Sequence, residues 1–522
     1  MFNAVSFRAA SATLQSLQWL LPPELRDACP AANTGQNWIL RIGLDELNRP
    51  KEAATDWALI MDHTIQLGKI KCLVIVGCRL SHWRKLGRPL QLQDLAVFAI
   101  EPVEQSNGDI VQAQLEEVCQ RFGIVPRNIV SDHGSDLKRG IELFQQHHPE
   151  VKASYDIAHM LAILIKRYLK RDDSWTEYSQ QCGQTRQSLQ QTDLAYLLPL
   201  TPKSKARYMN VESEVRVGFR TLVYLDRMKS RQLVKPEVQQ QEFLPAELLA
   251  LEELDLDIEF FDQDNIDDEH VDSEYLHGCF LTGDCTEARL PEAEDCIETE
   301  TFGGAQVLEE VIQELQTTET LDTPADALDV ESTSKDASTA DQALVTDRVD
   351  LEQLEAKLGW LHDFRPKLHE WLCLISIIRC TLKYIRTHGY HASARETLSA
   401  LLSEHGRYES SRSLIKEIET FVDSQSCQAA VGEHLLGSSE CIESLIGKGK
   451  RLEGQQSKGG FTKMILGMAA AVVTPTKDRI FSALSNVKTK DLKRWCAEKL
   501  GRSILSRRRE ALQPTDTGIN TG

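Results

Sequence analysis

The sequence has no two cysteines at the C-x-x-C spacing and no long hydrophobic run. Its 13 cysteines are scattered along 522 residues, so a structural zinc site is not expected and reduced, mostly buried thiols are. The apolar stretch FTKMILGMAAAVV (461–473) contains Lys463 and is shorter than the roughly 20 residues that span a bilayer. The first residues lack the pattern of a signal peptide. We therefore expect a cytoplasmic protein with no membrane segment.

Acidic charge is concentrated in one part of the chain. The formal net charge is −19, but residues 251–350 contain 31 Asp and Glu against three Lys and Arg. The rest is net positive, and residues 451–522 have 14 Lys and Arg against 6 Asp and Glu. Nucleic-acid binding is therefore compatible with the acidic total. The aromatic-poor, Ser/Thr/Ala-rich composition of 246–350 predicts a disordered acidic loop.

Hydrophobic patterning predicts an α/β fold. Apolar runs bounded by turn residues are typical of strands, and they lie at 57–64, 71–78, 95–102, 128–134 and 152–156. Helical spacing of apolar residues occurs at 109–123, 135–148 and 157–171. Three strands of an antiparallel meander, followed by alternating helices and strands, predict a mixed sheet with helices on both faces. This is the element order of the ribonuclease-H-like fold.

The patterning also divides the chain into five expected segments. They are an N-terminal helical segment and candidate truncated DNA-binding region (1–56), the first part of a ribonuclease-H-like catalytic domain (57–171), a mostly helical insertion (172–435) with the acidic loop 246–350, the final helix of the catalytic domain (436–475), and a basic C-terminal tail (476–522). The catalytic domain is thus expected to be interrupted by the insertion.

Asp62 and Asp132 each follow an apolar strand pattern. Asp62 is the sole charge in WALIMDHT (57–64), where a carboxylate is costly unless it is paired or binds a cation. The alternative is a strand that ends at Met61, but the strand pattern resumes past Asp62 and favours a functional role. Asp132 follows NIVS, at a strand end where ligands of open α/β sheets collect. It is equally a candidate N-cap for the helix from Ser135, and Asp136 competes for either role.

Asp156 and His159 follow the next strand, in the motif DIAH. Both residues are expected near the same edge of the sheet. Capping of the following helix is at least as good an interpretation of Asp156 as catalysis. The pair is also expected to support the site by holding its ligands in place.

Glu443 is the candidate third carboxylate. It lies in SSECIESLIGKGK (438–450), and Lys450 follows two helical turns later on the same face. Alone, such a pair is an ordinary feature of a solvated helix. A helix packed across the sheet would bring Glu443 to Asp62 and Asp132, and three carboxylates are what two Mg²⁺ ions require. Glu440, three residues earlier, is the alternative third carboxylate.

Together these residues resemble the DDE transposases and retroviral-type integrases. Asp62, Asp132 and the E-S-x-x-x-x-x-K pattern of Glu443 to Lys450 fit that superfamily. The segments WALIMDHTIQLGKIKCLVIVGC, IVSDHGSDL and SSECIESLIGKGKRLEGQQSKGGFTKMIL are similar to the three motif regions of a group of bacterial insertion-sequence transposases. The resemblance covers roughly 57–170 and 435–475. The Asp-x-x-His motif and the helical insertion before the glutamate are similar to those of the Mutator-like and hAT-like branches.

The resemblance implies that Asp62, Asp132 and Glu443 bind two Mg²⁺ (or Mn²⁺) ions. Metal-activated water would hydrolyse a phosphodiester at the element end, and the freed 3′ hydroxyl would attack target DNA. Contacts to DNA are implied for Lys448, Lys450, Lys458, Lys493 and Arg494. The expected partners are the element ends and the target DNA, bound by a homodimer or a higher assembly at the nucleoid.

Two other functions remain open. A catalytically inactive, transposase-derived repressor would bind terminal repeats without nicking them, although such a protein has no need of three converging carboxylates. Another ribonuclease-H-like nuclease would cut RNA–DNA hybrids, although the helical insertion and the E-S…K helix argue against it.

The 56 residues before the first strand are short for the DNA-binding domain usual in these transposases.

Overall fold

The computed structural model describes residues 6–20, 29–67, 70–103, 105–200, 208, 211–233, 351–454, 462–500, 508 and 512. The expected acidic loop 246–350 and Lys458 lie outside this described part of the chain. Within it, no helix is both long and apolar enough to cross a membrane. The cysteines in these ranges are all free thiols, as expected from their spacing.

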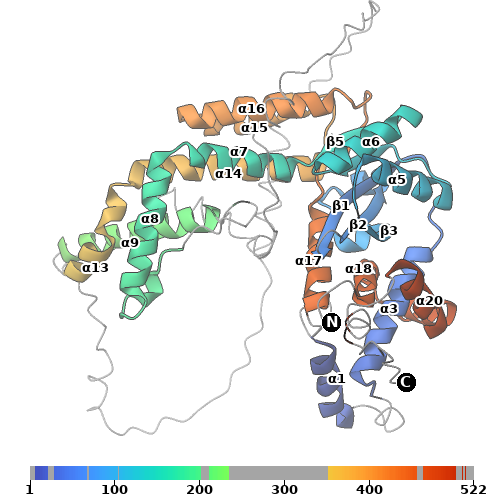
Figure 1. Ribbon diagram of the computed structural model, residues 1–522. Helices are drawn as coiled ribbons and strands as arrows, with labels where there is room; N and C mark the ends of the chain where they lie inside the picture. Colours follow the sequence, from blue (N-terminus) through green and yellow to red (C-terminus); the bar gives the residue numbers. More distant parts are fainter. Residues whose placement is uncertain are drawn as a thin grey trace, which may run out of the picture. The chain divides into compact units, whose positions relative to one another are not determined.

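A mixed sheet of five strands lies at the centre of the fold (Figure 1). The strands are β1 (Trp57–Leu67), β2 (Ile70–Arg79), β3 (Ala96–Val103), β4 (Asn128–Ser131) and β5 (Lys152–Tyr155). Their order is β3-β2-β1-β4-β5, so β1 is the middle strand. The pairs β1–β2 and β2–β3 are antiparallel, whereas β1–β4 and β4–β5 are parallel. The predicted mixed sheet is thereby confirmed.

Helices α5 (Gly108–Phe122) and α6 (Ser135–His147) cover one face of the sheet. Successive side chains of a strand point to opposite faces, and Leu59 and Met61 of β1 belong to the core under these two helices. The helices cross closely, because a Cβ at Gly140 of α6 would clash with Val111 of α5. We call this side the α5/α6 face.

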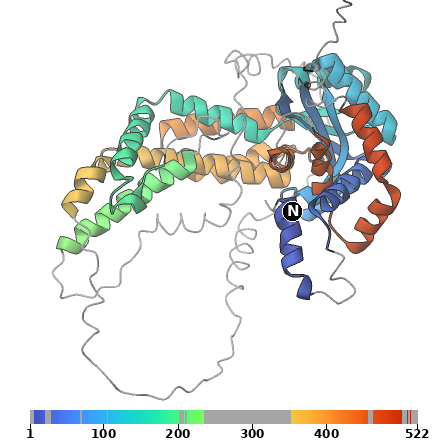
Figure 2. The same ribbon diagram turned by 60° about the horizontal axis from the view of Figure 1, so that its bottom comes forward.

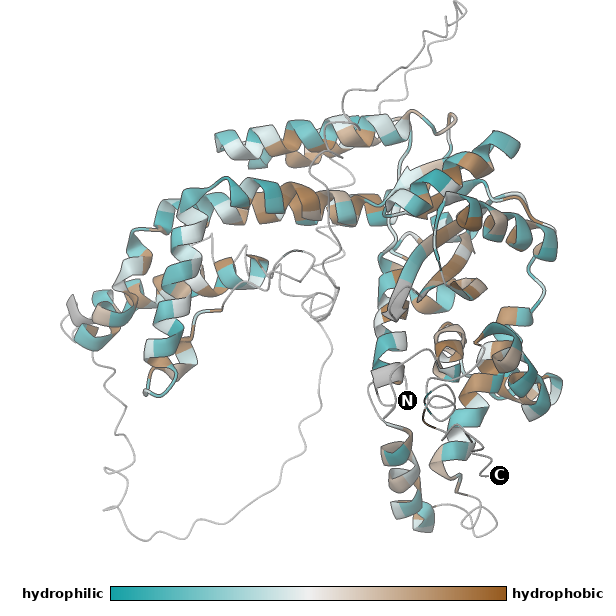
Figure 3. Ribbon diagram, viewed as in Figure 1, coloured by the Kyte–Doolittle hydropathy of each residue, from teal (hydrophilic) through white to brown (hydrophobic). Residues whose placement is uncertain are grey.

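Helices α3 (Ala32–Asn48), α17 (Glu440–Gly454) and α18 (Leu466–Ala471) cover the opposite face. Ala58 and Ile60 of β1 belong to the core on this side, together with Ile442 and Leu445 of α17. Figure 3 shows apolar residues concentrated along the strands that these helices enclose. We call this side the α17 face.

Both ends of the described chain contribute to the α17 face. From the N-terminal segment, α3 supplies Leu40, Leu44 and Leu47 to the core, so this helix is part of the sheet domain rather than a separate region. The stretch expected to be a basic tail contains α19 (Lys477–Asn486) and α20 (Thr489–Lys499). Both helices pack against α3, because each has apolar residues at helical spacing among its basic ones.

Between the sheet and α17 the chain forms a series of packed helices (Figure 2). They are α7 (Ile157–Lys170), α8 (Asp173–Leu189), α9 (Val211–Leu233), α13 (Leu351–Leu358), α14 (Arg365–His388), α15 (Ala394–Leu402) and α16 (Glu409–Ser426). Helix α14 contacts α7, α9, α15 and α16, and it is therefore the common support of this group. The remaining elements are α1 (Phe7–Ser16), α4 (Leu80–Leu86), η1 (Gln18–Leu20), η2 (Leu92–Asp94), η3 (Ala195–Leu197), η6 (Gly359–His362), η7 (Ser403–His405) and η8 (Lys463–Ile465).

A buried glutamate lies inside this helical group. Glu214 of α9 is only 1 % exposed, and its neighbours include Tyr178 and Cys182 of α8, both buried. Burial raises the pKa of the Glu214 carboxyl to about 8, and the nearby Ser179 hydroxyl offsets only a small part of this rise. The folded protein therefore holds a neutral carboxylic acid here at neutral pH.

Glu214→Gln is expected to stabilise the protein increasingly as pH rises. Between about pH 4.5 and pH 8, the unfolded chain releases a proton that folded Glu214 retains, so the free energy of unfolding falls across this range. Glutamine does not titrate in this range. The free energy of unfolding of the variant should therefore rise relative to that of the wild type by about 2–4 kcal/mol between pH 5 and pH 8. Urea unfolding at the two pH values measures the gain. The exposed control Glu177→Gln should show none, and an equal gain in both variants would contradict the assignment.

Candidate functional site

Asp62 lies in the middle strand, on the α17 face. Strand β1 continues to Leu67, so the aspartate does not begin a turn. Asp62 pairs in register with Val74 of β2, which belongs to the core of the α17 face along with Ile60. The side chain is partly exposed rather than fully buried. One carboxylate oxygen accepts the backbone N–H of His63 at 2.7 Å.

Asp132 occupies the matching position at the end of β4. The parallel register pairs Ala58 with Asn128 and Ile60 with Val130, so Asp62 and Asp132 each follow the last of these pairs by two residues. Asp132 accepts the N–H of Gly134 at 3.0 Å. It is not the N-cap of α6, because that position is Gly134. The two aspartates therefore occupy matching register positions on neighbouring strands, Asp62 within β1 and Asp132 directly after β4.

Asp136, the competitor of Asp132, belongs to the opposite face. Its carboxylate lies 3.7 Å from Nδ1 of His63 and 3.9 Å from Nζ of Lys71. His63 pairs with Leu73, which is in the core of the α5/α6 face. Burial raises the pKa of Asp136, but a hydrogen bond with Ser106 and the charges of His63 and Lys71 outweigh it, so the pKa lies below its usual value. Asp136 is thus part of a polar cluster that does not include Asp62.

His133 has the one positive φ angle among the non-glycine residues that the structure describes, at 58°. Its ring stacks on Tyr155 of β5 with centroids 4.6 Å apart. Burial and the charge of Lys138 lower the pKa of His133 to about 4, so the ring is neutral at physiological pH. A left-handed backbone costs free energy in a non-glycine residue and persists where the surroundings enforce it. The strained turn fixes the chain directly after Asp132.

Asp156 connects β4, α7 and the segment before α17. Its backbone N–H donates to the carbonyl of Ser131, the residue before Asp132, at 3.0 Å. Its fully buried carboxylate accepts the N–H groups of Ala158 and His159 at the start of α7. The same carboxylate accepts the N–H of Ser439 at 3.1 Å. The predicted capping role is confirmed, and the bond from Ser439 gives Asp156 a second role.

The Asp156 contacts set the start of the helix that carries Glu443. The N–H of Ile157 donates to the carbonyl of Gly437 at 2.9 Å, next to the bond from Ser439. A Cβ at Gly437 would clash with Ile385 and Tyr390, so the chain passes close to α14 at this point. The carboxyl end of β4 and the start of α17 are thus held by one residue.

His159 lies in the first turn of α7, beside the same aromatic group. Its ring centroid is 5.8 Å from that of Tyr155, and Tyr155 also stacks on His133. The hydroxyl of Tyr390 donates to the backbone carbonyl of Tyr155 at 2.9 Å. The histidine that the sequence pairs with Asp156 therefore lies against Tyr155, which in turn stacks on His133 in the turn that follows Asp132.

The two candidate glutamates of α17 have different surroundings. Glu440 forms an ion pair with Arg386 of α14, and Oγ of Ser438 lies 3.4 Å from its carboxylate. Glu443 is partly buried and follows Ile442, which packs into the core of the α17 face with Ile60. Helix α17 contacts β1 directly. Glu440 therefore binds the helical group, whereas Glu443 lies next to the residue that packs against the sheet.

The predicted DNA-binding residues lie in two places. Lys448 and Lys450 are partly buried on α17, and burial together with the charge of Arg451 lowers the pKa of Lys448. Lys493 and Arg494 are exposed on α20, which packs against α3. The two pairs are thus on different helices of the sheet domain.

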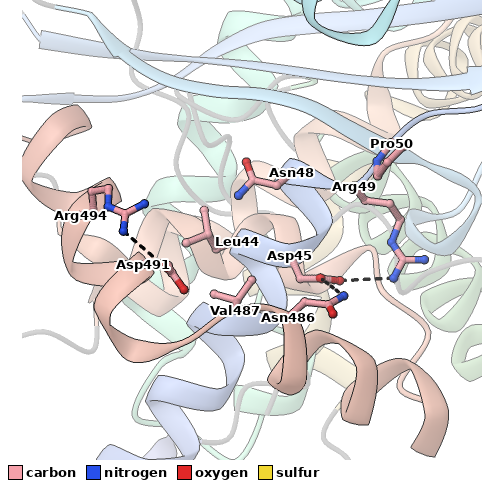
Figure 4. Close-up of a pocket in the computed structure, with 9 residues that line it drawn as sticks. All are labelled: Leu44, Asp45, Asn48, Arg49, Pro50, Asn486, Val487, Asp491 and Arg494. Carbon is pink, nitrogen blue, oxygen red and sulfur yellow. Dashed lines mark hydrogen bonds and ion pairs between the residues drawn. The ribbon is translucent and has the colours of Figure 1, made fainter.

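No three His, Cys, Asp or Glu side chains of the described ranges are grouped closely enough to hold a metal ion in their present rotamers. The cavity in Figure 4, of about 540 Å³, lies elsewhere, between the end of α3 and the α19–α20 turn. Its charges are paired with each other, Asp45 with Arg49 at 3.3 Å and Asp491 with Arg494 at 3.5 Å. We assign it no ligand.

Three residues that contact the candidate site residues were not predicted from the sequence, namely Ser439, Arg386 and Tyr155. Ser439 precedes the helix in SSEC, which is a start signal, but its backbone N–H rather than its hydroxyl makes the contact. Arg386 lies in an ordinary helical pattern and Tyr155 in a short strand. Nothing in their local sequence predicts contacts with residues hundreds of positions away.

Asp156→Ala is expected to release the start of α17. The change leaves the N–H groups of Ala158, His159 and Ser439 without their acceptor, which should lower the free energy of unfolding by about 2–4 kcal/mol. Asp156→Asn keeps one acceptor oxygen and should cost less. Hydrogen exchange should accelerate at Ser439 and in the first turn of α17. Unchanged exchange there would show that Asp156 does not hold the segment.

Comparison with known proteins adds no family to this description. No protein-family profile matches the sequence, and no curated protein matches it. The interpretation of the site therefore rests on the positions and contacts of its own residues.

Proposed function

We propose that the chain is a DDE-type transposase that cleaves DNA strands at insertion-sequence ends and joins them to target DNA. The observation that carries the proposal is the register of β1 and β4. It gives Asp62, within β1, and Asp132, directly after β4, matching positions two residues beyond Ile60 and Val130, which both belong to the core of the face that α17 covers. Glu443, on the helix that covers this face, would complete a set of three acidic residues from segments far apart in sequence.

The topology supports the same proposal. An antiparallel meander extended by two parallel strands, in the order β3-β2-β1-β4-β5, is the arrangement expected of a ribonuclease-H-like domain. The helices from α8 to α16 would then be an insertion between α7 and α17. The positions at the centre of such a sheet, where β1 and β4 meet, are where ligands of open α/β sheets collect.

The donor set fits hard divalent cations. Asp62, Asp132 and Glu443 supply only carboxylate oxygens, the ligands that Mg²⁺ and Mn²⁺ prefer. Two of the three groups now accept backbone N–H groups of their own chain, from His63 and Gly134. Like charges repel one another, so the carboxylates are expected to converge only around cations. Bound ions would activate the attacking oxygen and neutralise charge on the phosphate.

The other residues of the site would position the ligands and the DNA. Asp156 fixes the start of α17 against the end of β4, which limits the separation of Glu443 and Asp132. Lys448 and Lys450 follow Glu443 on the same helix, where ammonium groups would contact the DNA backbone near the scissile phosphate. The ion pair with Arg386 makes Glu440 a structural residue, which favours Glu443 as the third ligand.

Asp62→Asn, Asp132→Asn and Glu443→Gln are each expected to reduce Mg²⁺-dependent nicking of element-end DNA by about 10³-fold or more. Each change removes one carboxylate ligand while leaving the fold and the basic surface in place. Gel assays of strand cleavage measure the loss, and anisotropy assays should show retained DNA binding.

Two matched controls lie next to these residues. Asp136→Asn and Glu440→Gln make the same chemical changes in groups that bind His63 and Arg386 instead. Both should keep most of the cleavage activity. Full cleavage in any of the three ligand variants would remove that residue from the site, and binding without cleavage in the wild type would support the repressor alternative.

Mg²⁺ is expected to stabilise the wild-type protein in the absence of DNA. Ions that bind the folded state alone raise the melting temperature, by at least about 2 °C at a concentration well above Kd. Asp62→Asn and Asp132→Asn should lose this rise, and without metal they should melt at or above the wild-type temperature because carboxylate repulsion is relieved. Calorimetry with and without 10-fold excess EDTA measures both effects. A rise in Asp132→Asn equal to that of the wild type would place the ion elsewhere.

A further inference from the structure

Helix α20 presents a basic face that no other described part of the protein covers. We propose that α20 is a DNA-recognition helix that enters the major groove of duplex DNA. The proposal rests on the proposed function for the identity of the polymer, and on the surface of α20 for the place of contact. It concerns a second DNA contact, separate from the carboxylates.

One side of α20 is anchored and the other is solvent-exposed. Leu492 and Trp495 are buried in the core of the α17 face. The exposed residues recur at helical spacing and form one continuous stripe, namely Thr489, Lys490, Lys493, Arg494, Ala497 and Glu498. In the first two turns of the helix the residues of this stripe are basic or neutral, and its acidic residue, Glu498, lies at the C-terminal end. This is the distribution expected of a helix that approaches a polyanion with its N-terminal half.

The cations of this stripe are mostly uncompensated. Lys490 and Lys493 have no ion pair within the described ranges, and neither has Lys488 in the turn before the helix. Arg494 pairs with Asp491 at 3.5 Å but keeps 64 % of its side chain exposed. Asp491 also accepts the N–H of Lys488 at 2.9 Å, so part of its charge is engaged at the helix start. The positive potential therefore points outward.

Helices α19 and α20 are held rigidly against α3. Arg479 of α19 forms ion pairs with Asp45 and Glu46, two acids of α3 that are each 7 % exposed. Arg41 of α3 donates to the carbonyls of Leu484 and Val487 at the end of α19. The two acidic residues of α3 are thus paired with Arg479. Their negative charge therefore does not neutralise the basic stripe of α20.

A further ion pair fixes the other end of α20. Nζ of Lys499 lies 2.8 Å from the Glu101 carboxylate of β3. The helix is thus tied to the sheet at its end and to α3 along its buried side. A binding helix on such a support loses little conformational entropy when it docks.

The exposed side chains favour duplex DNA over a single strand. Proteins that bind single strands stack bases on aromatic rings, whereas Trp495, the aromatic residue of α20, is buried. A lone helix of this width fits the major groove of B-DNA, where lysine and arginine bind guanine edges and phosphates.

The double variant Lys490→Ala, Lys493→Ala tests the proposal. Fluorescence anisotropy measures binding of the full chain to a 30-base-pair duplex at several salt concentrations. The affinity of the variant should be about tenfold or more below that of the wild type near 0.1 M salt. The magnitude of the slope of log K against log salt should decrease by about 1.8, because each lysine is expected to contact one phosphate. Its melting temperature should stay within about 2 °C of the wild type, because both side chains are exposed.

The matched control removes the same charge elsewhere. Lys383→Ala, Lys416→Ala changes two exposed lysines of α14 and α16, and it should keep the wild-type affinity and slope. An equal loss in both double variants, or unchanged duplex binding in the α20 variant, would overturn the proposal. An equal loss of affinity for single-stranded DNA and heparin would also overturn it, since the surface would then bind any polyanion.

The experiment separates this proposal from the proposed function. If no DNA is cleaved by the wild type but the α20 variant loses duplex binding, the transposase assignment fails and the recognition helix stands. If the wild type cleaves DNA while the α20 variant binds the duplex normally, the transposase assignment stands and the recognition helix fails.

Discussion

The arrangement of the candidate site depends on one buried carboxylate that satisfies backbone donors of two separate segments. Asp156 takes N–H groups from the start of α7 and from Ser439, while its own N–H binds the end of β4. A buried charge of this kind is tolerable only when such donors surround it. Because the donors are backbone groups, the geometry is insensitive to the side chains around it. The helix carrying Glu443 therefore begins at a fixed point relative to Asp132.

The two faces of the sheet divide the acidic residues into different roles. On the α17 face, alternation places Asp62 beyond Ala58 and Ile60. On the α5/α6 face, His63, Lys71 and Asp136 form a polar cluster with its own compensating charges. A shift of one residue in the register of β1 would exchange the faces of Asp62 and His63, the two of these residues that belong to this strand. The apolar residues on both faces of β1 make that shift unfavourable, so core packing also determines which face of the sheet Asp62 occupies.

The sheet and its nearest helices were predictable, because apolar runs and helical spacing are local properties. Strand β1 was expected through Asp62, and the capping role of Asp156 was an explicit alternative that the structure confirms. What the sequence did not reveal depends on contacts between distant segments. The ion pair of Glu440 with Arg386 separates two glutamates that look equivalent in sequence. The packing of α19 and α20 on α3 was missed because their many basic residues obscured a sparse apolar pattern.

The α17 face has a consequence for biosynthesis. Its core joins α3 near the start of the chain to α17, α18 and α20 near the end. At about 5–20 residues per second, the ribosome needs roughly 20–80 s to proceed from Asp62 to Glu443. During that interval the apolar residues of β1 and β2 on this side have no helix α17 to cover them. The apolar side of the nascent sheet is therefore uncovered until α17 is made, and Glu443 is added long after Asp62 and Asp132.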